Sequence, residues 1–139
     1  RRRDRRGQLI SAVSTLVVGG LWYSPLLFAV PWSKGVGLDM NDPVLMAEMK
    51  KTMWMHYVSA VIAAAVTAAV LFKLRNVLQL TSAVQGMELG LFCWAGFVAP
   101  VKFVDALFGK RGQKILLIES GYHLVTFVIM GAIIGAWRP

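Results

Sequence analysis

The sequence predicts an all-α membrane protein, an up-and-down bundle of four transmembrane helices with short amphipathic helices at the membrane surface. Hydrophobic residues make up 57% of the 139-residue chain and charged residues only 16%, a more apolar composition than that of ordinary soluble domains. The chain also contains four apolar runs, each close to the length of about 20 residues that spans a bilayer. A soluble fold of this size could not bury them. We therefore expect one integral membrane domain over residues 1–139.

The four helices are expected in sequence order after a basic N-terminal segment, residues 1–7. The first ends in the sequence LWYSP, where the aromatic side chains suit a membrane interface and the proline ends or bends the helix. The centre of the second, VIAAAVTAAV, consists largely of small residues, which predicts burial between other helices. The expected helices cover residues 8–28, 53–72, 81–101 and 115–137.

Two shorter segments have the pattern of amphipathic surface helices. One covers residues 44–51, with Asp42 as its N-cap and Pro43 at its first position, which are the residue types that start helices. The other covers residues 102–108. We expect both to lie along the membrane surface, outside the four spanning helices.

Small residues at intervals of four, most of them glycines, indicate where helices approach closely. This spacing places the small residues on one helical face, which lets two backbones come together. We interpret the motif as helix packing and not as a specific dimer signal. The residues concerned are Gly19, Gly86, Gly90, Gly131 and Gly135.

The net charge of +8 does not indicate a nucleic-acid partner. The basic residues stand mainly at helix ends and in loops, where membrane proteins carry anchoring and topology signals. The densest group predicts binding of anionic lipid headgroups and consists of Arg1, Arg2, Arg3, Arg5 and Arg6. An Arg-rich, acid-poor start also fits an organellar import segment, so we favour the mitochondrial inner membrane over a bacterial inner membrane.

Six ionisable side chains are expected to gather at one end of the bundle. Because successive helices reverse direction, the ends of the first and third helices face the same side as the starts of the second and fourth. Glu119 and His123 are four residues apart on one helical face, within hydrogen-bonding reach. The expected cluster consists of Tyr23, His56, Lys102, Asp105, Glu119 and His123.

This cluster has two interpretations. Ionisable groups inside a membrane are costly and usually either pair or serve a function. The cluster could form a small polar cavity for a proton relay, an ion or a quinone headgroup, with His123 and Glu119 at its centre. Alternatively, Glu119, Asp105 and Lys102 neutralise one another while the Tyr and Trp residues form an aromatic belt. We favour the second interpretation, because Glu119 lies only about one turn inside its helix.

Glu88 lies apart from this cluster, about two turns into the third helix. We expect it to form a structural ion pair with Arg75 or Lys73 across the short preceding turn, or to accept a hydrogen bond from Thr67. A protonated carboxyl group within the membrane is the alternative.

The sequence contains no catalytic or metal-binding motif. It has no CxxC, phosphate-binding loop or HExxH, and the single cysteine, Cys93, suits packing in an apolar run. His56, His123, Glu119 and Asp105 include possible ligands, but no two have an established metal spacing. We therefore expect no enzyme activity, no metal and no cofactor.

Three stretches of the chain resemble one known family. They read GGLWYSPLLF followed by Trp32, WAGFVAPVK, and ESGYHLVTFVIMGAIIGAW. Together they are similar to domain-of-unknown-function family 1761, small integral membrane proteins of about four helices. The resemblance runs from about Ile10 to Trp137 and departs at Ala29 and Val30, where such proteins often have a Gly-Lys-like pair. It implies a fold and a membrane location but no activity, so it implies no catalytic residue.

The functional hypothesis that follows is structural. A chain of 15.3 kDa with short loops and small-residue helix faces suits an accessory subunit of a larger membrane protein complex, with lipids and other membrane subunits as partners. The alternative is a transporter for a small solute, an ion or protons that acts as a homo-oligomer, because four helices enclose little volume alone. A membrane enzyme using the His and Glu residues has the least support.

Overall fold

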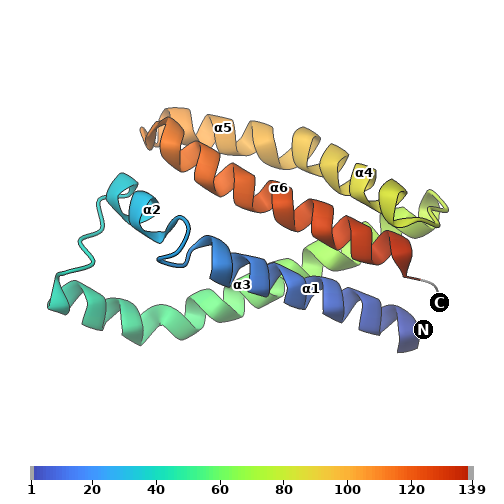
Figure 1. Cartoon of the computed structure of the whole chain (residues 1–139), viewed down its shortest axis with the longest axis horizontal. Coiled ribbons are helices and arrows are strands. Elements are labelled where there is room, and N and C mark those ends of the chain that lie inside the picture. Colours follow the sequence, from blue (N-terminus) through green and yellow to red (C-terminus); the bar gives the residue numbers. More distant parts are fainter. Residues whose placement is uncertain (1, 138–139) are drawn as a thin grey trace.

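The structure, a computed structural model, describes residues 2–137, and all regular elements in this part of the chain are helical. This confirms the all-α class. Both ends of the described chain lie at one end of the molecule, opposite the α2 region (Figure 1). The elements in order are α1 (Arg2–Trp22), α2 (Ala29–Gly35), α3 (Pro43–Val77), α4 (Ala83–Cys93), the π-helix η1 (Trp94–Val98), α5 (Ala99–Phe108) and α6 (Gly112–Ala136).

Three helical segments are long and apolar enough to cross a membrane. They are Pro43–Val77, Ala83–Phe108 and Gly112–Ala136, and the second of these joins α4, η1 and α5 into one rod. The protein therefore has the helices of a membrane protein. The helix α1 is not among the three, because its first turns are rich in arginine.

The first helix differs from its expected bounds of residues 8–28 at both ends. It begins at Arg2 and ends at Trp22, so the basic N-terminal segment continues the helix. The early end agrees with Pro25, because proline disfavours a helical conformation in the residue before it. Residues 23–28 form turns that lead into α2.

The expected surface helix at residues 44–51 and the expected span at 53–72 are one continuous helix, α3. Its start agrees with the sequence, since the Asp42 carboxylate accepts hydrogen bonds from the backbone N–H groups of Val44 (2.9 Å) and Leu45 (3.3 Å). The separation into two helices was wrong. After Pro43 the segment contains no further glycine or proline, so nothing in it interrupts helical geometry.

The expected amphipathic segment at residues 102–108 likewise continues the third span. Pro100 lacks a backbone N–H, and its ring would crowd the carbonyl of the residue four positions earlier. The wider π-helical turn η1 immediately precedes this position and accommodates the proline without ending the rod. The rod ends at Phe108, and Lys110 and Gly112 adopt positive φ angles of 50° and 78° in the turn to α6.

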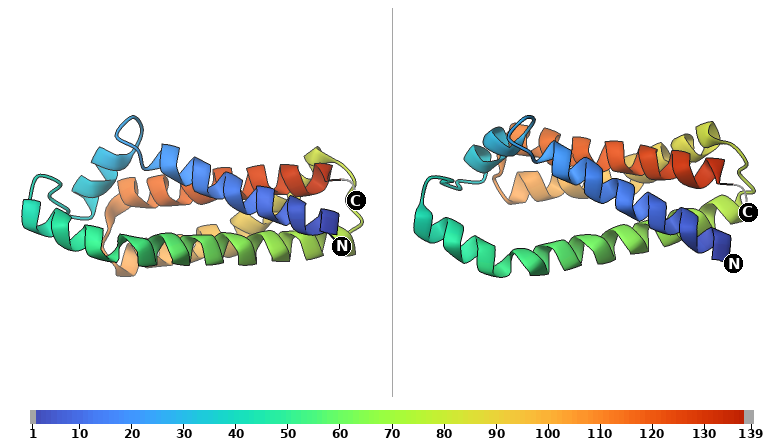
Figure 2. Two further views of the ribbon diagram at one scale, coloured as in Figure 1. Left: turned by 90° about the horizontal axis from the view of Figure 1, so that it is seen from below. Right: turned by 60° about the horizontal axis from the view of Figure 1, so that its bottom comes forward.

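The closest contact in the fold joins α4 to α6, which lie side by side (Figures 1 and 2). A Cβ atom added at Gly86 would meet the carbonyl oxygen of Gly131, and one added at Gly131 would meet the carbonyl oxygen of Gly86. Gly90 faces the backbone of Phe127 and Gly135 faces that of Ser82 in the same way. Four of the five predicted packing glycines thus lie in one backbone-to-backbone contact. The fifth, Gly19, faces the Tyr122 hydroxyl, 3.1 Å from its ideal Cβ position.

The core lies where α1, α4 and α6 meet the C-terminal half of α3. Its buried residues include Cys93, in agreement with the packing role expected for this cysteine. The members are Ala12, Ala64, Ala68, Leu71, Phe72, Cys93, Met130 and Ile134.

The N-terminal half of α3 has no such cover. Every residue from Trp54 to Ala63 is exposed, because this half of the helix diverges from the other helices (Figure 1). The expected burial of VIAAAVTAAV was therefore largely wrong: within this sequence only Ala64 and Ala68 are buried.

The substitution Gly131→Ala tests the contact between α4 and α6. The added methyl group would displace the Gly86 backbone, so we expect the free energy of unfolding to fall by about 1–3 kcal/mol, the usual cost of overpacking. The measurement is unfolding in mixed micelles with increasing denaturing detergent. Gly20→Ala is the matched control, because nothing lies within 4 Å of its added Cβ. Equal stability of the two variants would contradict the contact.

Candidate functional site

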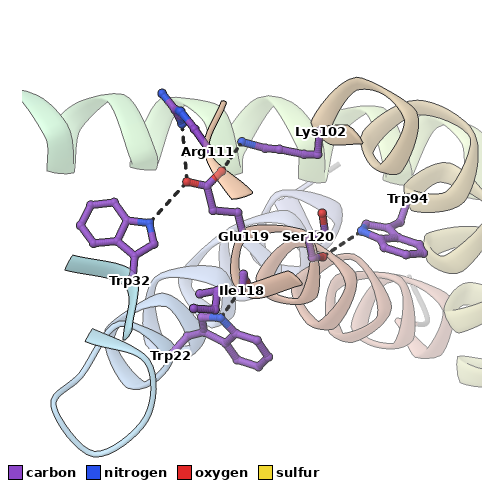
Figure 3. Close-up of polar contacts among 8 residues, drawn as sticks. All are labelled: Trp22, Trp32, Trp94, Lys102, Arg111, Ile118, Glu119 and Ser120. Carbon is purple, nitrogen blue, oxygen red and sulfur yellow. Dashed lines mark hydrogen bonds and ion pairs between the residues drawn. The ribbon is translucent and has the colours of Figure 1, made fainter. Parts of the chain in front are cut away.

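Three tryptophan indole N–H groups converge on the start of α6. The donors come from three different elements: Trp22 ends α1, Trp32 lies in α2, and Trp94 begins η1. Their acceptors are three consecutive residues of α6, namely the backbone carbonyl of Ile118 (2.9 Å), the carboxylate of Glu119 (3.3 Å) and the backbone carbonyl of Ser120 (3.0 Å) (Figure 3). The arrangement ties distant parts of the chain to one segment of one helix.

Local chemistry explains how α6 accepts these donors. A carbonyl oxygen has two lone pairs, so it can keep its helical hydrogen bond and accept an indole N–H as well. An indole N–H that is removed from water needs such a partner. Gly121 leaves room for the approach, since a Cβ atom there would lie 3.1 Å from a ring carbon of Trp22.

The Glu119 carboxylate is the centre of the ionic part of the site. Its Oε2 atom lies 3.1 Å from the Lys102 ammonium, and its Oε1 atom lies 3.7 Å from the Arg111 guanidinium and accepts the Trp32 bond (Figure 3). The Glu119 side chain is only 14% exposed. Two cations and one neutral donor therefore share a partly buried carboxylate, which is the usual way to keep such a charge within an apolar region.

Arg111 replaces Asp105 in the expected cluster. Lys102 pairs with Glu119 as predicted, but Asp105 is exposed on α5, and its side chain forms no ion pair or hydrogen bond with the described residues. The prediction for Asp105 was wrong because Lys102 faces α6 and Asp105 does not. Arg111 was missed, although a basic residue in the turn two helical turns before Glu119 was a usable signal.

An aromatic series extends from the ionic site. The Tyr23 ring lies 5.7 Å from the Trp32 ring and 5.4 Å from the Tyr122 ring, and Tyr122 lies 5.1 Å from His123, all between centroids. Burial raises the pKa of Tyr23 above its ordinary value, and the charge of Glu119 raises it further. Tyr23 thus stays a neutral phenol.

His123 lies in this aromatic series and is not bonded to Glu119. No hydrogen bond joins the two side chains in the described part of the chain, because both carboxylate oxygens are engaged elsewhere. The hydroxyl of Tyr122, the residue before His123, donates to the Thr15 carbonyl at 3.4 Å. The ring contacts link the α1–α2 turn and α2 to α6, and the Tyr122 hydrogen bond links α1 to α6.

His56 lies outside the ionic site. It is exposed on α3, and its Nδ1 atom lies 2.9 Å from the Thr52 carbonyl. It lines a cavity of about 490 Å³ that Tyr23 and Trp32 also line. Of the six residues expected to gather, the structure therefore brings together Tyr23, Lys102, Glu119 and His123 through direct contacts or a short series of rings, and it places His56 beside a neighbouring cavity.

The opposite end of the molecule has a different set of contacts. Arg75 donates to the Trp137 carbonyl at 2.7 Å and to the Asn76 side chain at 2.8 Å. The Trp137 indole donates to the Arg3 carbonyl at 2.9 Å. Glu88 is exposed and its side chain has no partner among the described residues, so the expected ion pair with Arg75 does not form.

The predicted headgroup-binding arginines lie at this end, in the first turns of α1. Arg1 falls outside the described residues, and the other four side chains are exposed. Binding of anionic lipid by this group remains a prediction. Among residues 2–137, no three His, Cys, Asp or Glu side chains are grouped closely enough to hold a metal ion.

The profile of a family described as a protein of unknown function, DUF1761, matches residues 7–135. The chain belongs to the DUF1761 family. This confirms the resemblance drawn from the sequence motifs. No curated protein and no solved structure shows significant similarity to the chain. The description of the DUF1761 family assigns no activity to this site.

The substitution Trp94→Phe tests whether the indole bonds hold the DUF1761 fold together. It keeps an aromatic ring but removes the donor to Ser120, so we expect the free energy of unfolding to fall by about 0.5–1.5 kcal/mol. Trp54→Phe is the control, because Trp54 is 65% exposed and makes no hydrogen bond with the described residues. Equal unfolding midpoints in detergent for the two variants would show that the bond to Ser120 contributes nothing.

The substitution Glu119→Gln tests the ionic part. It removes the charge that neutralises Lys102 and Arg111, and we expect a loss of about 1–3 kcal/mol, as for a partly buried group left without its partner. Glu48→Gln, on the exposed start of α3, should change stability little. Thermal unfolding of both variants provides the measurement, and an unchanged Glu119→Gln protein would contradict the structural role.

Proposed function

We propose that this protein is a non-catalytic integral membrane subunit that associates with other membrane proteins through the N-terminal half of α3. The observation that carries the proposal is the uninterrupted exposure of residues 54–63. No residue of this segment is buried by the rest of the chain, although His56 lines the cavity beside α2, whereas the C-terminal half of the same helix contributes to the core.

The residues of this exposed segment suit a protein partner. Ser59, Ala60 and Ala63 are small and exposed, and small residues permit the close helix approach that stabilises association in membranes. The segment also contains His56, and ionisable side chains in membrane helices usually face protein or water in preference to lipid. A second helix would therefore pack against these small residues and His56 better than lipid chains would.

The Glu119 site supports a structural role. Its carboxylate is shared among Lys102, Arg111 and Trp32. Both carboxylate oxygens are therefore engaged in contacts that join α2, α5 and the α5–α6 turn to α6. This is the arrangement expected of the neutralised ion-pair cluster that we favour over a proton relay. A transporter acting as a homo-oligomer is the alternative, and the oligomeric state separates the two.

We also propose that α1 forms the fourth membrane span. It runs along α6 and across α3 (Figure 2). Its apolar side chains that these helices leave exposed, such as Leu9 and Val13, would then face lipid. Its arginines would then lie at the headgroups, in line with the predicted lipid binding. The mitochondrial inner membrane stays our favoured location for this bundle.

Gentle detergent extraction from native membranes, native-gel separation and mass spectrometry test the association. We expect the protein in a larger complex at fixed stoichiometry. Ala60→Phe with Ala63→Phe should release most of the protein from that complex without unfolding it, because both positions are exposed within the chain. Val17→Phe, at a 57% exposed position of α1, is the control and should remain in the complex.

Two outcomes would contradict this proposal. If the wild-type protein migrates alone, no accessory role exists under the conditions of its native membrane. If it migrates as a small homo-oligomer, the accessory subunit is wrong and the transporter alternative becomes the account to test.

A further inference from the structure

Methionines are concentrated around one cavity of the molecule. The cavity of about 490 Å³ lies between α2, the following loop and the start of α3, and four methionines line it: Met40, Met46, Met49 and Met53. The whole chain contains seven methionines, so more than half of them surround this one space. Leucine or valine would line an acyl-chain pocket equally well, which makes the choice of thioether side chains informative.

Helical spacing places the α3 residues of this set on one face. Met46, Met49, Met53 and His56 follow one another at intervals of three, four and three residues, and such intervals bring side chains to the same side of a helix. Met40 approaches from the loop before α3. Two separate parts of the chain thus supply thioethers to one cavity, with an imidazole beside them.

The hydrogen bond of His56 fixes its tautomer. Its Nδ1 atom lies 2.9 Å from the backbone carbonyl of Thr52, and a carbonyl oxygen can only accept. In the neutral imidazole the proton therefore sits on Nδ1, which leaves the lone pair on Nε2 for a metal ion. Histidines that bind metals commonly donate their other ring N–H to a carbonyl in this way.

The remaining lining is neutral. The described residues around the cavity include no carboxylate and no lysine or arginine. The cavity therefore lacks the carboxylate ligands that hard divalent cations prefer. Thioethers and imidazole instead favour soft Cu(I). Trp32 also lines the cavity, and its indole ring can attract a cation through its face.

We propose that this cavity binds Cu(I) through the thioethers of Met46, Met49 and Met53 and the imidazole of His56, with Met40 closing the site from the loop. The ion fills only part of the space. Methionine has three rotatable side-chain bonds, so the sulfur atoms can converge on one ion without movement of the backbone. The site shares His56 with the exposed segment of the accessory-subunit proposal, but its three α3 thioethers, Met46, Met49 and Met53, lie before that segment.

The test is a competition titration on the purified full-length chain in detergent, without oxygen, between the protein and a chromogenic Cu(I) chelator. We expect one Cu(I) ion per chain. The triple variant M46L/M49L/M53L keeps the apolar volume but removes three sulfur atoms. Its Cu(I) affinity should fall by at least about tenfold, because removing even the hydrogen-bond partner of a metal ligand costs about that much. His56→Gln should also weaken binding.

The double variant M55L/M87L is the matched control. Both methionines are exposed, and neither lines the cavity, so Cu(I) affinity should stay at the wild-type value. Circular dichroism and thermal unfolding check that each variant folds. X-ray absorption spectroscopy of the copper-loaded wild type identifies the atoms bound to the copper without any variant. We expect sulfur and nitrogen neighbours.

Three results would overturn the proposal. The wild type could fail to compete for Cu(I), or the triple variant could bind as tightly as the wild type. X-ray absorption could show oxygen and nitrogen neighbours only. If mass spectrometry finds a co-purified lipid in both the wild type and M46L/M49L/M53L while Cu(I) is not retained, the cavity is an acyl-chain site instead.

Discussion

The backbone contact between α4 and α6 is the constraint on which the other features depend. Gly86 and Gly131 face each other so closely that neither position can accept a side chain. In a membrane the hydrophobic effect does not drive helices together, so such close packing is a main source of association. It fixes α6 beside the α4–η1–α5 rod, and it thereby holds Glu119 within reach of Lys102 and brings Trp94 to the Ser120 carbonyl. The contacts of Lys102 and Trp94 with α6 therefore depend on this glycine contact.

Much of the fold could be predicted from local pattern. Apolar runs gave the helices, the Asp42–Pro43 start of α3 was read from capping chemistry, and glycine spacing indicated the faces that pack. The errors arose where a local signal was overridden by its surroundings. The amphipathic pattern of residues 44–51 predicted a surface helix separate from the span, but no residue there interrupts α3. The third span was expected to end at residue 101, just after Pro100, yet a π-helical turn accommodates the proline and the rod continues to Phe108.

The candidate site was harder to predict because its contacts join residues far apart in sequence. Trp22 and Trp32 find their acceptors on α6, 96 and 87 residues away. No local spacing encodes these pairs, because they join α1 and α2 to a helix near the other end of the chain. The choice between Asp105 and Arg111 as the neighbour of Lys102 and Glu119 depends on how α5 is rotated against α6. The positions of charged residues in the sequence do not determine this rotation. The sequence therefore indicated which groups could meet but not which of them do.

The account gives the chain two parts: a bundle held by glycine contacts and tryptophan bonds, and a long helix whose first half lacks cover. Its central claim is that another protein covers that half in the membrane. The most direct measurement is photo-crosslinking in native membranes from a photoreactive amino acid at Ala60 or Ala63, with Val17 for comparison. We predict one discrete protein adduct from each α3 position and only lipid adducts from Val17. Lipid adducts alone from all three positions would contradict the claim.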